Sequence, residues 1–316
     1  MRTSDIDWDA PPIHAIVLGE LGTGKTSFMA QAAKFSQCAW VITDPNTLPT
    51  LLSLGLDVEY ETFAETDLTQ VSAFNDLCDY VDKILNTWTK EGKNNPSSTL
   101  IIDGIPGLMD LAMYRAMFLK GNTPPKKGNS STSSLRGDPL GYYRAGKNTG
   151  LQELKSISDM GDYNVMGSMV KHMLSHIAMQ PCNVLCSCHI LAEKDATGNI
   201  VEDICVNKAM KQPVPSRFSE AWVIRSEEHP LAGGGSRTVR VIDTRASISR
   251  YARTAYEHIL MKREKAYLPY LRDKIIAGLK KEDRNTLDYM DPGEVVIDQD
   301  KKATSNATQK GGWTAK

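Results

Sequence analysis

The chain has 316 residues, of which 41% are hydrophobic and 24% charged, a composition typical of a globular protein with one large or two modest domains. A formal net charge of −1 excludes a protein whose whole surface attracts nucleic acid or anionic membrane, so any DNA site must be a local basic patch. No stretch approaches the roughly 20 apolar residues that span a bilayer, and residues 1–12 lack the apolar segment of a signal peptide.

The number and positions of the cysteines indicate the cellular compartment. The chain contains six cysteines, too few for a disulfide framework in a chain of this length, and Cys182, Cys186 and Cys188 fall in one apolar run. Such a pattern suits a reducing environment. The sequence therefore predicts a cytoplasmic protein with no membrane partner.

The N-terminal half alternates short apolar runs with segments of helical periodicity. These patterns predict strands over residues 13–18, 39–43, 58–63 and 99–103, and helices over residues 25–36, 69–89 and 107–119. A turn of Asp44, Pro45 and Asn46 ends the second strand, and Asp103 ends the fourth. Strands alternating with helices indicate a mainly parallel, twisted sheet with helices on both faces.

The composition then changes abruptly, because residues 121–150 are rich in Gly, Asn, Ser and Pro and predict a flexible basic insertion. Beyond it we expect a helix over residues 154–179, a strand over 183–189, a hairpin over 190–206, strands over 221–225 and 238–243, and a helix over 255–281. The predicted domains are a tail (1–12), an α/β core with C-terminal β additions (13–254), a helical extension (255–290) and a disordered tail (291–316).

One motif carries the chemistry. Residues 19–26 match the phosphate-binding pattern G-x-x-x-x-G-K-S/T, between a predicted buried strand and a predicted helix. Glycines let backbone N–H groups turn toward phosphates, Lys25 should reach the β- and γ-phosphates, and the Thr26 hydroxyl should ligate Mg²⁺. The predicted nucleotide-binding residues are Gly19, Glu20, Leu21, Gly22, Thr23, Gly24, Lys25, Thr26 and Ser27. The sequence therefore predicts ATP and Mg²⁺ as ligands.

A second part of such a site is an acidic residue at the end of another buried strand. Asp103 follows Leu100, Ile101 and Ile102 and is expected to hold the metal through water. The next residue is Gly104, so the catalytic carboxylate must come from elsewhere.

Asp44 ends the strand that follows the predicted phosphate-binding helix, and because RecA-type ATPases take their catalytic carboxylate from this position, a resemblance to them makes Asp44 the candidate general base. A turn-forming aspartate before Pro45 is an equally good interpretation. Glu61 and Glu65, near the end of the next strand, are alternatives.

A third element is His189, at the tip of the strand predicted over residues 183–188. In sheets of the RecA type, the strand formed later in sequence lies between the phosphate-loop strand and the strand of the metal-binding acid. Similarity to that class therefore implies that His189 would sense the γ-phosphate and pass hydrolysis on to the loop beyond it. A strand-capping histidine is the alternative. Strand alternation places Cys186 and Cys188 on one face and His189 on the other, which argues against a zinc site.

With these elements assembled, the chain resembles phage-encoded AAA-type, RecA-core nucleotide-binding proteins, a group that includes single-strand annealing ATPases. The resemblance covers about residues 13–253. Besides the phosphate loop and residues 101–103, it rests on Asp162-Tyr163, on residues 183–185 leading to His189, and on residues 214–218. Relatives often carry an acidic turn of Thr-Glu-Gly type where this chain has Thr43, Asp44, Pro45 and Asn46.

The resemblance implies a RecA-like ATPase fold, a host-cell location, and a homo-oligomer with nucleotide between subunits, where a neighbour supplies a cation to the γ-phosphate. Candidates for this trans-acting cation are Arg240, Arg245, Arg250 and Arg253.

Single-stranded DNA is the predicted partner, because flexible basic segments with aromatics can follow phosphates while stacking bases. Candidate DNA-binding residues are Lys126, Lys127, Arg136, Tyr142, Tyr143, Arg144, Lys147, Lys194, Lys208 and Lys211. Three functions remain open at this point: a DNA-recombination ATPase that anneals strands, an ATP-driven motor or helicase-loader-like protein, and a nucleotide switch that assembles a complex without nucleic acid.

Overall fold

The structure is a computed structural model, and it describes residues 11–66, 71–121, 160–194, 200–230, 235–245 and 251–281. The chain divides into two units, Met1–Lys280 and Lys281–Lys316, and the fold below is that of the first unit. The predicted tails, most of the predicted insertion over residues 121–150, and the predicted first turns of the helix over residues 154–179 lie outside the described residues.

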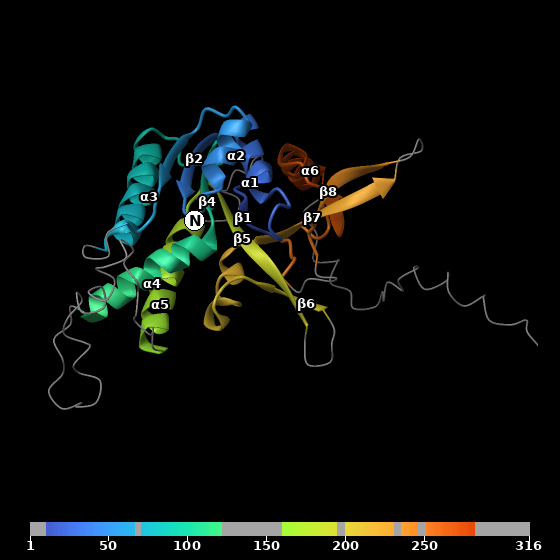
Figure 1. Cartoon of the computed structure of the whole chain (residues 1–316). Helices are drawn as coiled ribbons and strands as arrows, with labels where there is room; N and C mark the ends of the chain where they lie inside the picture. Colours follow the sequence, from blue (N-terminus) through green and yellow to red (C-terminus); the bar gives the residue numbers. More distant parts are fainter. Residues whose placement is uncertain are drawn as a thin grey trace, which may run out of the picture. The chain divides into compact units, whose positions relative to one another are not determined.

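A mostly parallel sheet of nine strands forms the centre of the unit, with helices on both faces (Figure 1). Its strands run in the order β3-β2-β4-β5-β1-β7-β8-β9, and β6 pairs with the second half of β5. The strands are β1 (His14–Gly19), β2 (Gln37–Ile42), β3 (Glu59–Thr62), β4 (Ser98–Asp103), β5 (Asn183–Lys194), β6 (Ile200–Ile204), β7 (Glu220–Pro230), β8 (Ser236–Asp243) and β9 (Arg263–Lys265).

The helices are α1 (Lys25–Met29), α2 (Thr47–Ser53), α3 (Ala73–Lys90), α4 (Ile105–Gly121), α5 (Met160–Ala178) and α6 (Leu268–Lys281). Short 3₁₀ turns cover Ala30–Lys34 directly after α1, and Lys208–Met210 and Pro215–Arg217 before β7. None of the helices in the described part of the chain is both long enough and apolar enough to span a bilayer.

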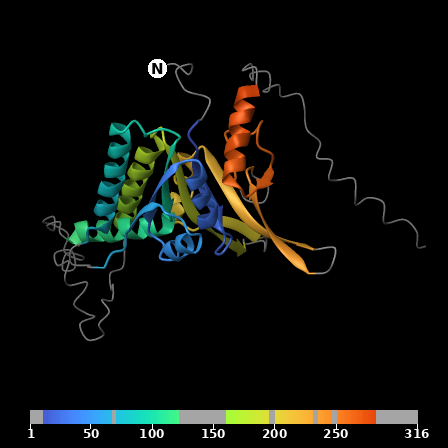
Figure 2. The ribbon, with the colours of Figure 1, turned by 90° about the horizontal axis from the view of Figure 1, so that it is seen from above.

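Helices cover both faces of the sheet (Figure 2), and a hydrophobic cluster packs on each face. Strand alternation sends Ile102 and Cys186 to the face covered by α3, α4 and α5, and sends Ile101 and Leu185 to the face covered by α1, α2 and α6. Strand β4 is buried along its whole length, as expected for a central parallel strand covered on both sides. The predicted three-layer α/β arrangement is therefore confirmed.

The order of the strands confirms a specific prediction. Strand β5 pairs with β1 on one side and with β4 on the other, in parallel register, so that Gly19 lies opposite His189. Strand β5 thus lies between the phosphate-loop strand and the Asp103 strand, as predicted, but it does not end at His189: its parallel pairing ends there, and the strand continues to Lys194. The predicted hairpin is also present, since β5 turns into antiparallel pairing with β6.

The predicted helix over residues 255–281 is wrong in its first half. Residues 255–267 form turns and the short strand β9, and only Leu268–Lys281 is helical. Residues 263–265 form a strand instead of a helix because they pair with β8. This pairing buries Glu264, whose carboxylate accepts a hydrogen bond from Met261 N at 2.8 Å. Leu271 and Ile275 of α6 pack on the sheet.

Helix α2 was not expected from the sequence, where only the turn before it was recognised. Its residues Thr47–Ser53 follow the turn of Asp44, Pro45 and Asn46 directly, and the helix buries Thr47 and Leu51. Proline at residue 49 lies in its first turn, where the missing N–H has no partner to lose. The consequence for the site is described below.

A buried acid on β7 makes stability depend on pH. Glu220 is fully buried, and burial raises its pKa from the ordinary 4.5 to about 7, although hydrogen bonds from Thr254, Ala255 N and Trp222 Nε1 offset part of this effect. The folded protein therefore holds a proton on Glu220 at pH values where the unfolded chain has lost it.

Because the native pKa lies above the unfolded one, this stabilisation is complete below pH 4.5 and is lost as pH rises through about 7. We predict that the ionisation of Glu220 lowers the free energy of unfolding by on the order of 3 kcal/mol as the pH rises between these limits. The Glu220→Gln variant, which cannot titrate, should lack this part of the pH dependence. Urea unfolding of both proteins from pH 5 to pH 8 measures the difference, and parallel pH profiles would contradict the assignment.

Candidate functional site

The phosphate loop connects β1 to α1 at the carboxyl edge of the sheet. Gly22 and Gly24 have φ values of 78° and 88°, in the left-handed region that side-chain-bearing residues rarely adopt. Gly24 is the residue before α1, and Thr23 Oγ1 donates to Glu20 O at 2.9 Å across the turn. The glycines of the motif are thus placed where the backbone requires them.

Lys25 is the first residue of α1, and its ammonium group turns back into the loop. Nζ donates to Gly19 O at 3.0 Å and to Glu20 O at 2.8 Å, and it lies 3.1 Å from His189 Nδ1. Only 7% of the residue is exposed, and burial lowers its pKa, while the charges of Asp103 and Asp44 act in the opposite direction. A cation is therefore held at the centre of the loop.

The Asp103 carboxylate accepts hydrogen bonds from hydroxyl groups on three other elements. Thr26 Oγ1 of α1 donates to Oδ2 at 2.7 Å, and Thr47 Oγ1 of α2 donates to the same atom at 2.8 Å. Ser187 Oγ of β5 donates to Oδ1. Asp103 is 3% exposed, so these three donors replace the water that an exposed carboxylate would bind.

This arrangement suits Mg²⁺. A hydroxyl and a carboxylate are hard oxygen ligands, and Mg²⁺ in nucleotide sites takes one or two protein groups and completes its octahedron with water and phosphate oxygens. Among the described residues no cluster of three or more His, Cys, Asp or Glu side chains could hold a metal. Thr26 and Asp103 are the residues of the site that could hold such an ion.

Gly104, the residue after Asp103, has no room for a side chain. A Cβ at this position would come within 2.8 Å of Ser187 Oγ. The Thr43 hydroxyl also binds both backbone groups of this residue: it donates to Gly104 O at 2.7 Å and accepts from Gly104 N at 2.9 Å. A catalytic glutamate directly after the metal acid is thus sterically incompatible with the contact between Ser187 and Asp103.

Asp44 both forms a turn and faces the site. Its Oδ1 accepts hydrogen bonds from Asn46 N at 2.9 Å and from Asn46 Nδ2 at 3.1 Å. Its Oδ2 lies 3.9 Å from His189 Nε2. The turn-forming interpretation of Asp44 is therefore confirmed, and its second oxygen faces His189.

His189 lies between Lys25 and Asp44. Since the Lys25 ammonium group can only donate, Nδ1 of His189 accepts, and the imidazole proton is on Nε2, toward Asp44. Burial lowers the pKa of His189 and the charge of Lys25 lowers it further, whereas Asp44 and Asp103 raise it. The result is a neutral imidazole in contact with a cation.

The two alternative bases lie elsewhere. Glu65 Oε2 accepts from Ala73 N at 3.1 Å, which places its carboxylate at the beginning of α3. Glu61 is exposed on β3, the edge strand beyond β2, opposite Val41. Of the three acids considered, Asp44 is the one beside His189.

The candidate arginines have different surroundings. Arg245 Nη2 donates to Leu260 O at 2.8 Å, and Arg253 Nη2 donates to Pro215 O at 2.9 Å and to Phe218 O, so both are held by carbonyls of their own chain. Arg250 lies outside the described residues. Arg240, on β8, is exposed, and its guanidinium group lies against Gly24 of the phosphate loop.

Most candidate DNA-binding residues lie outside the described part of the chain: Lys126, Lys127, Arg136, Tyr142, Tyr143, Arg144 and Lys147. Lys194 is the last residue of β5, with only its backbone described. Lys208 is exposed in a 3₁₀ turn, and Lys211 forms an ion pair with Asp203. Lys208 and Lys211 therefore lie just beyond the β5–β6 hairpin.

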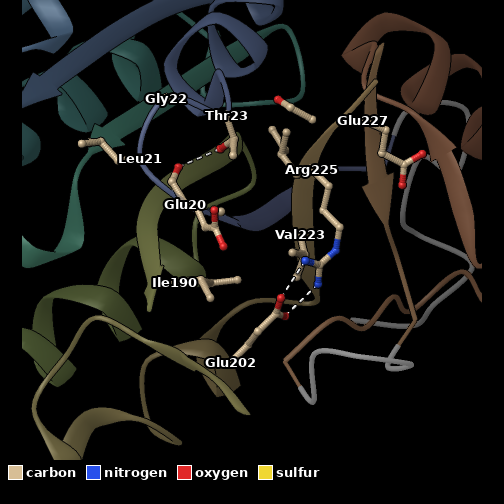
Figure 3. Close-up of a pocket in the computed structure, with 12 residues that line it drawn as sticks. Glu20, Leu21, Gly22, Thr23, Ile190, Glu202, Val223, Arg225 and Glu227 are labelled. Atoms are coloured by element: carbon tan, nitrogen blue, oxygen red, sulfur yellow. Dashed lines mark hydrogen bonds and ion pairs between the residues drawn. The ribbon is translucent and has the colours of Figure 1, made fainter. Parts of the chain in front are cut away.

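A cavity of about 410 Å³ borders the outer side of the phosphate loop (Figure 3). Glu20 and Leu21 of the loop and Ile190 of β5 line it, and Glu202 of β6 and Arg225 of β7 meet at its side. Arg225 binds Glu202 through two hydrogen bonds, at 2.6 and 2.7 Å, and its Nε donates to Asp243 Oδ2 at 2.6 Å. This ion pair fixes the β5–β6 hairpin to the sheet beside the loop.

Two residues of the site were missed in the sequence. Ser187 could have been found from alternation, since it lies two residues before His189 and so on the same face of β5. Thr47 carried no such signal, because its role depends on a helix that was not predicted. Both donate hydrogen bonds to the Asp103 carboxylate.

No protein-family model matches the chain, and no curated protein matches it.

We predict that the pKa of the His189 imidazole lies below 6.5. Lys25→Met should raise this pKa, because it removes the neighbouring positive charge, and Asp44→Asn should lower it further, because it removes the negative one. NMR titration of the imidazole Cε1–H measures this, with the His189→Gln spectrum identifying the resonance. A wild-type value above 6.5, or equal values in all three proteins, would contradict the proposed contacts.

Proposed function

We propose that this protein is a Mg²⁺-dependent P-loop ATPase of the RecA-like type, acting in the cytoplasm. The observation that carries the proposal is the hydrogen bond of 2.7 Å between Thr26 Oγ1 and Asp103 Oδ2, with the Lys25 ammonium group in the adjacent loop. A phosphate loop, a metal hydroxyl and a metal acid in one place are the parts that nucleoside triphosphate binding requires.

The order of the strands supports the RecA-like subclass. Strand β5, whose parallel pairing with β1 ends at His189, lies between β1 and β4, and Gly104 leaves no space for a glutamate next to Asp103. The carboxylate that orients the attacking water is then Asp44, which lies across His189 from Lys25. In this proposal Lys25 binds the β- and γ-phosphates, and Asp44 accepts the proton of the water.

His189 connects the nucleotide to the rest of the protein in this proposal. It is the residue at which β5 leaves its parallel partners, and its carbonyl accepts from Cys205 N at 2.7 Å just after β6. Loss of the γ-phosphate changes the charge facing Lys25 and His189, and β5 continues directly into the hairpin. The hairpin is therefore the proposed output of ATP hydrolysis.

We further propose that the output acts on single-stranded DNA, in strand annealing during recombination, repair or replication. The support is the resemblance to phage annealing ATPases and the position of Lys208 and Lys211 beyond the hairpin. A homo-oligomer belongs to the same proposal, with residues 121–150 as additional DNA contacts. An ATP-driven motor or helicase loader, and an assembly switch without nucleic acid, are the alternatives.

We predict that Lys25→Ala weakens ATP binding roughly ten- to a hundredfold, because it removes a charge-assisted contact to phosphate. Asp44→Asn should instead bind ATP normally and lower turnover roughly 10²- to 10⁴-fold, as loss of a general base does. Calorimetric titration with Mg-ATP and phosphate release measure the two effects, with exposed Arg217→Ala as control. Unchanged affinity in Lys25→Ala would refute the ATP site, and normal turnover in Asp44→Asn would exclude this base.

Stimulation of hydrolysis by single-stranded DNA tests the second proposal. We predict a several-fold increase in turnover that weakens as salt rises and is lost when Lys126, Lys127, Arg136 and Arg144 become alanine. Annealing of complementary oligonucleotides should require the same residues. Translocation or unwinding of duplex DNA would favour the motor, and hydrolysis indifferent to nucleic acid would favour the switch.

A further inference from the structure

Arg240 lies in direct contact with the phosphate loop of its own chain. A Cβ built on Gly24 would come within 2.8 Å of both Cζ and Nε of Arg240 and within 3.2 Å of its Cδ. Ile242, two residues along β8, packs in the cluster that includes α1 and α6. Alternation along the strand therefore directs Arg240 to the same face, where the loop begins α1.

The guanidinium group of Arg240 is an available cation. The residue is exposed, and within the described ranges this group forms no hydrogen bond or ion pair. By contrast, Arg225 and Arg263 on the neighbouring strands are paired with Asp243. Arg240 thus places an uncompensated charge beside backbone amides that bind phosphate in this type of loop.

The position of Arg240 in the sheet defines which end of a nucleotide it faces. Thr26 and Asp103 mark the metal side, toward β5 and β4, whereas Arg240 is on β8, on the opposite side of β1. Thr26 and Asp103 would hold the metal beside the terminal phosphates of a bound nucleotide. The α-phosphate, ribose and base would then extend from the loop toward β8.

A cavity of about 610 Å³ lies in that direction and includes Arg240 in its wall. Arg237, Lys265 and Tyr267 also line it, so among the described lining residues three are cationic and none is acidic. Tyr267 is 42% exposed, and Lys34 Nζ lies 4.9 Å from the centroid of its ring. A cationic wall with a partly exposed aromatic ring suits a phosphorylated, aromatic ligand.

We infer that Arg240 binds the polyphosphate of the nucleotide held by its own subunit, and that the cavity lined by Tyr267 receives the ribose and base. This inference rests on the proposed ATP site and adds to it a binding place for the ribose and base. It assigns Arg240 to its own subunit, whereas the resemblance implied an arginine that crosses to a neighbour.

Calorimetric titration with Mg-ATP and with inorganic tripolyphosphate separates the two parts of the inference. Arg240→Ala should weaken binding of both ligands roughly ten- to a hundredfold. Tyr267→Ala should weaken ATP alone, because tripolyphosphate has no base. Arg217→Ala is the matched control, since this exposed arginine precedes β7 and so lies at the opposite edge of the sheet from the loop.

The outcomes distinguish this inference from the proposed function. Wild-type protein that binds neither ligand refutes the ATP site itself. Binding by wild type together with unchanged affinity in Arg240→Ala overturns the inference and leaves the ATP site intact. Equal affinity for ATP in wild type and Tyr267→Ala overturns the assignment of the base cavity. Thermal unfolding of each variant shows that a loss of affinity is not a loss of fold.

A mixing experiment determines whether Arg240 acts within one subunit. Lys25→Ala carries Arg240 but a defective loop, and Arg240→Ala carries an intact loop. An arginine that crosses between subunits would restore high-affinity ATP binding and hydrolysis in the mixture. We expect no restoration above the sum of the separate proteins, and restoration would overturn the assignment.

Discussion

The carboxylate of Asp103 is the constraint on which the site depends. A carboxylate that is 3% exposed is stable only when hydrogen-bond donors replace its water, and Thr26, Thr47 and Ser187 supply them from three different elements. These bonds join α1, α2 and β5 to the end of β4. The same contact with Ser187 explains why the next residue is Gly104, since a Cβ there would displace the serine hydroxyl.

Electrostatics around the loop follow from this arrangement. Because β5 lies between β1 and β4, His189 reaches the ammonium group of Lys25 on one side and the carboxylate of Asp44 on the other. Burial and the lysine charge keep the imidazole neutral, so a proton-bearing Nε2 faces the acid. In the proposed function, a change of charge at the phosphates of the nucleotide would act first on His189 of β5, the strand that continues into the hairpin.

The other side of the loop is built by the C-terminal strands. Arg225 joins Glu202 of β6 to Asp243 of β8, and Arg263 of β9 binds Asp243 and Glu227. These ion pairs hold the hairpin and the strands β7 to β9 in one frame next to the loop. Arg240 projects from this frame without a partner in the described part of the chain, which distinguishes it from Arg245 and Arg253.

Local pattern alone determined the phosphate loop, the strand ending in Asp103 and the alternation of strands with helices, because loop glycines and buried parallel strands leave a signature in neighbouring residues. It also placed the strand that contains His189 between the other two, although that strand continues past His189 to Lys194. Tertiary structure alone brought Thr47 and Ser187 to Asp103, placed Arg240 on Gly24, and made residues 263–265 a strand where periodicity predicted a helix. These features depend on contacts between residues far apart in the chain, and such contacts are decided by strand order and packing, which local propensity does not encode.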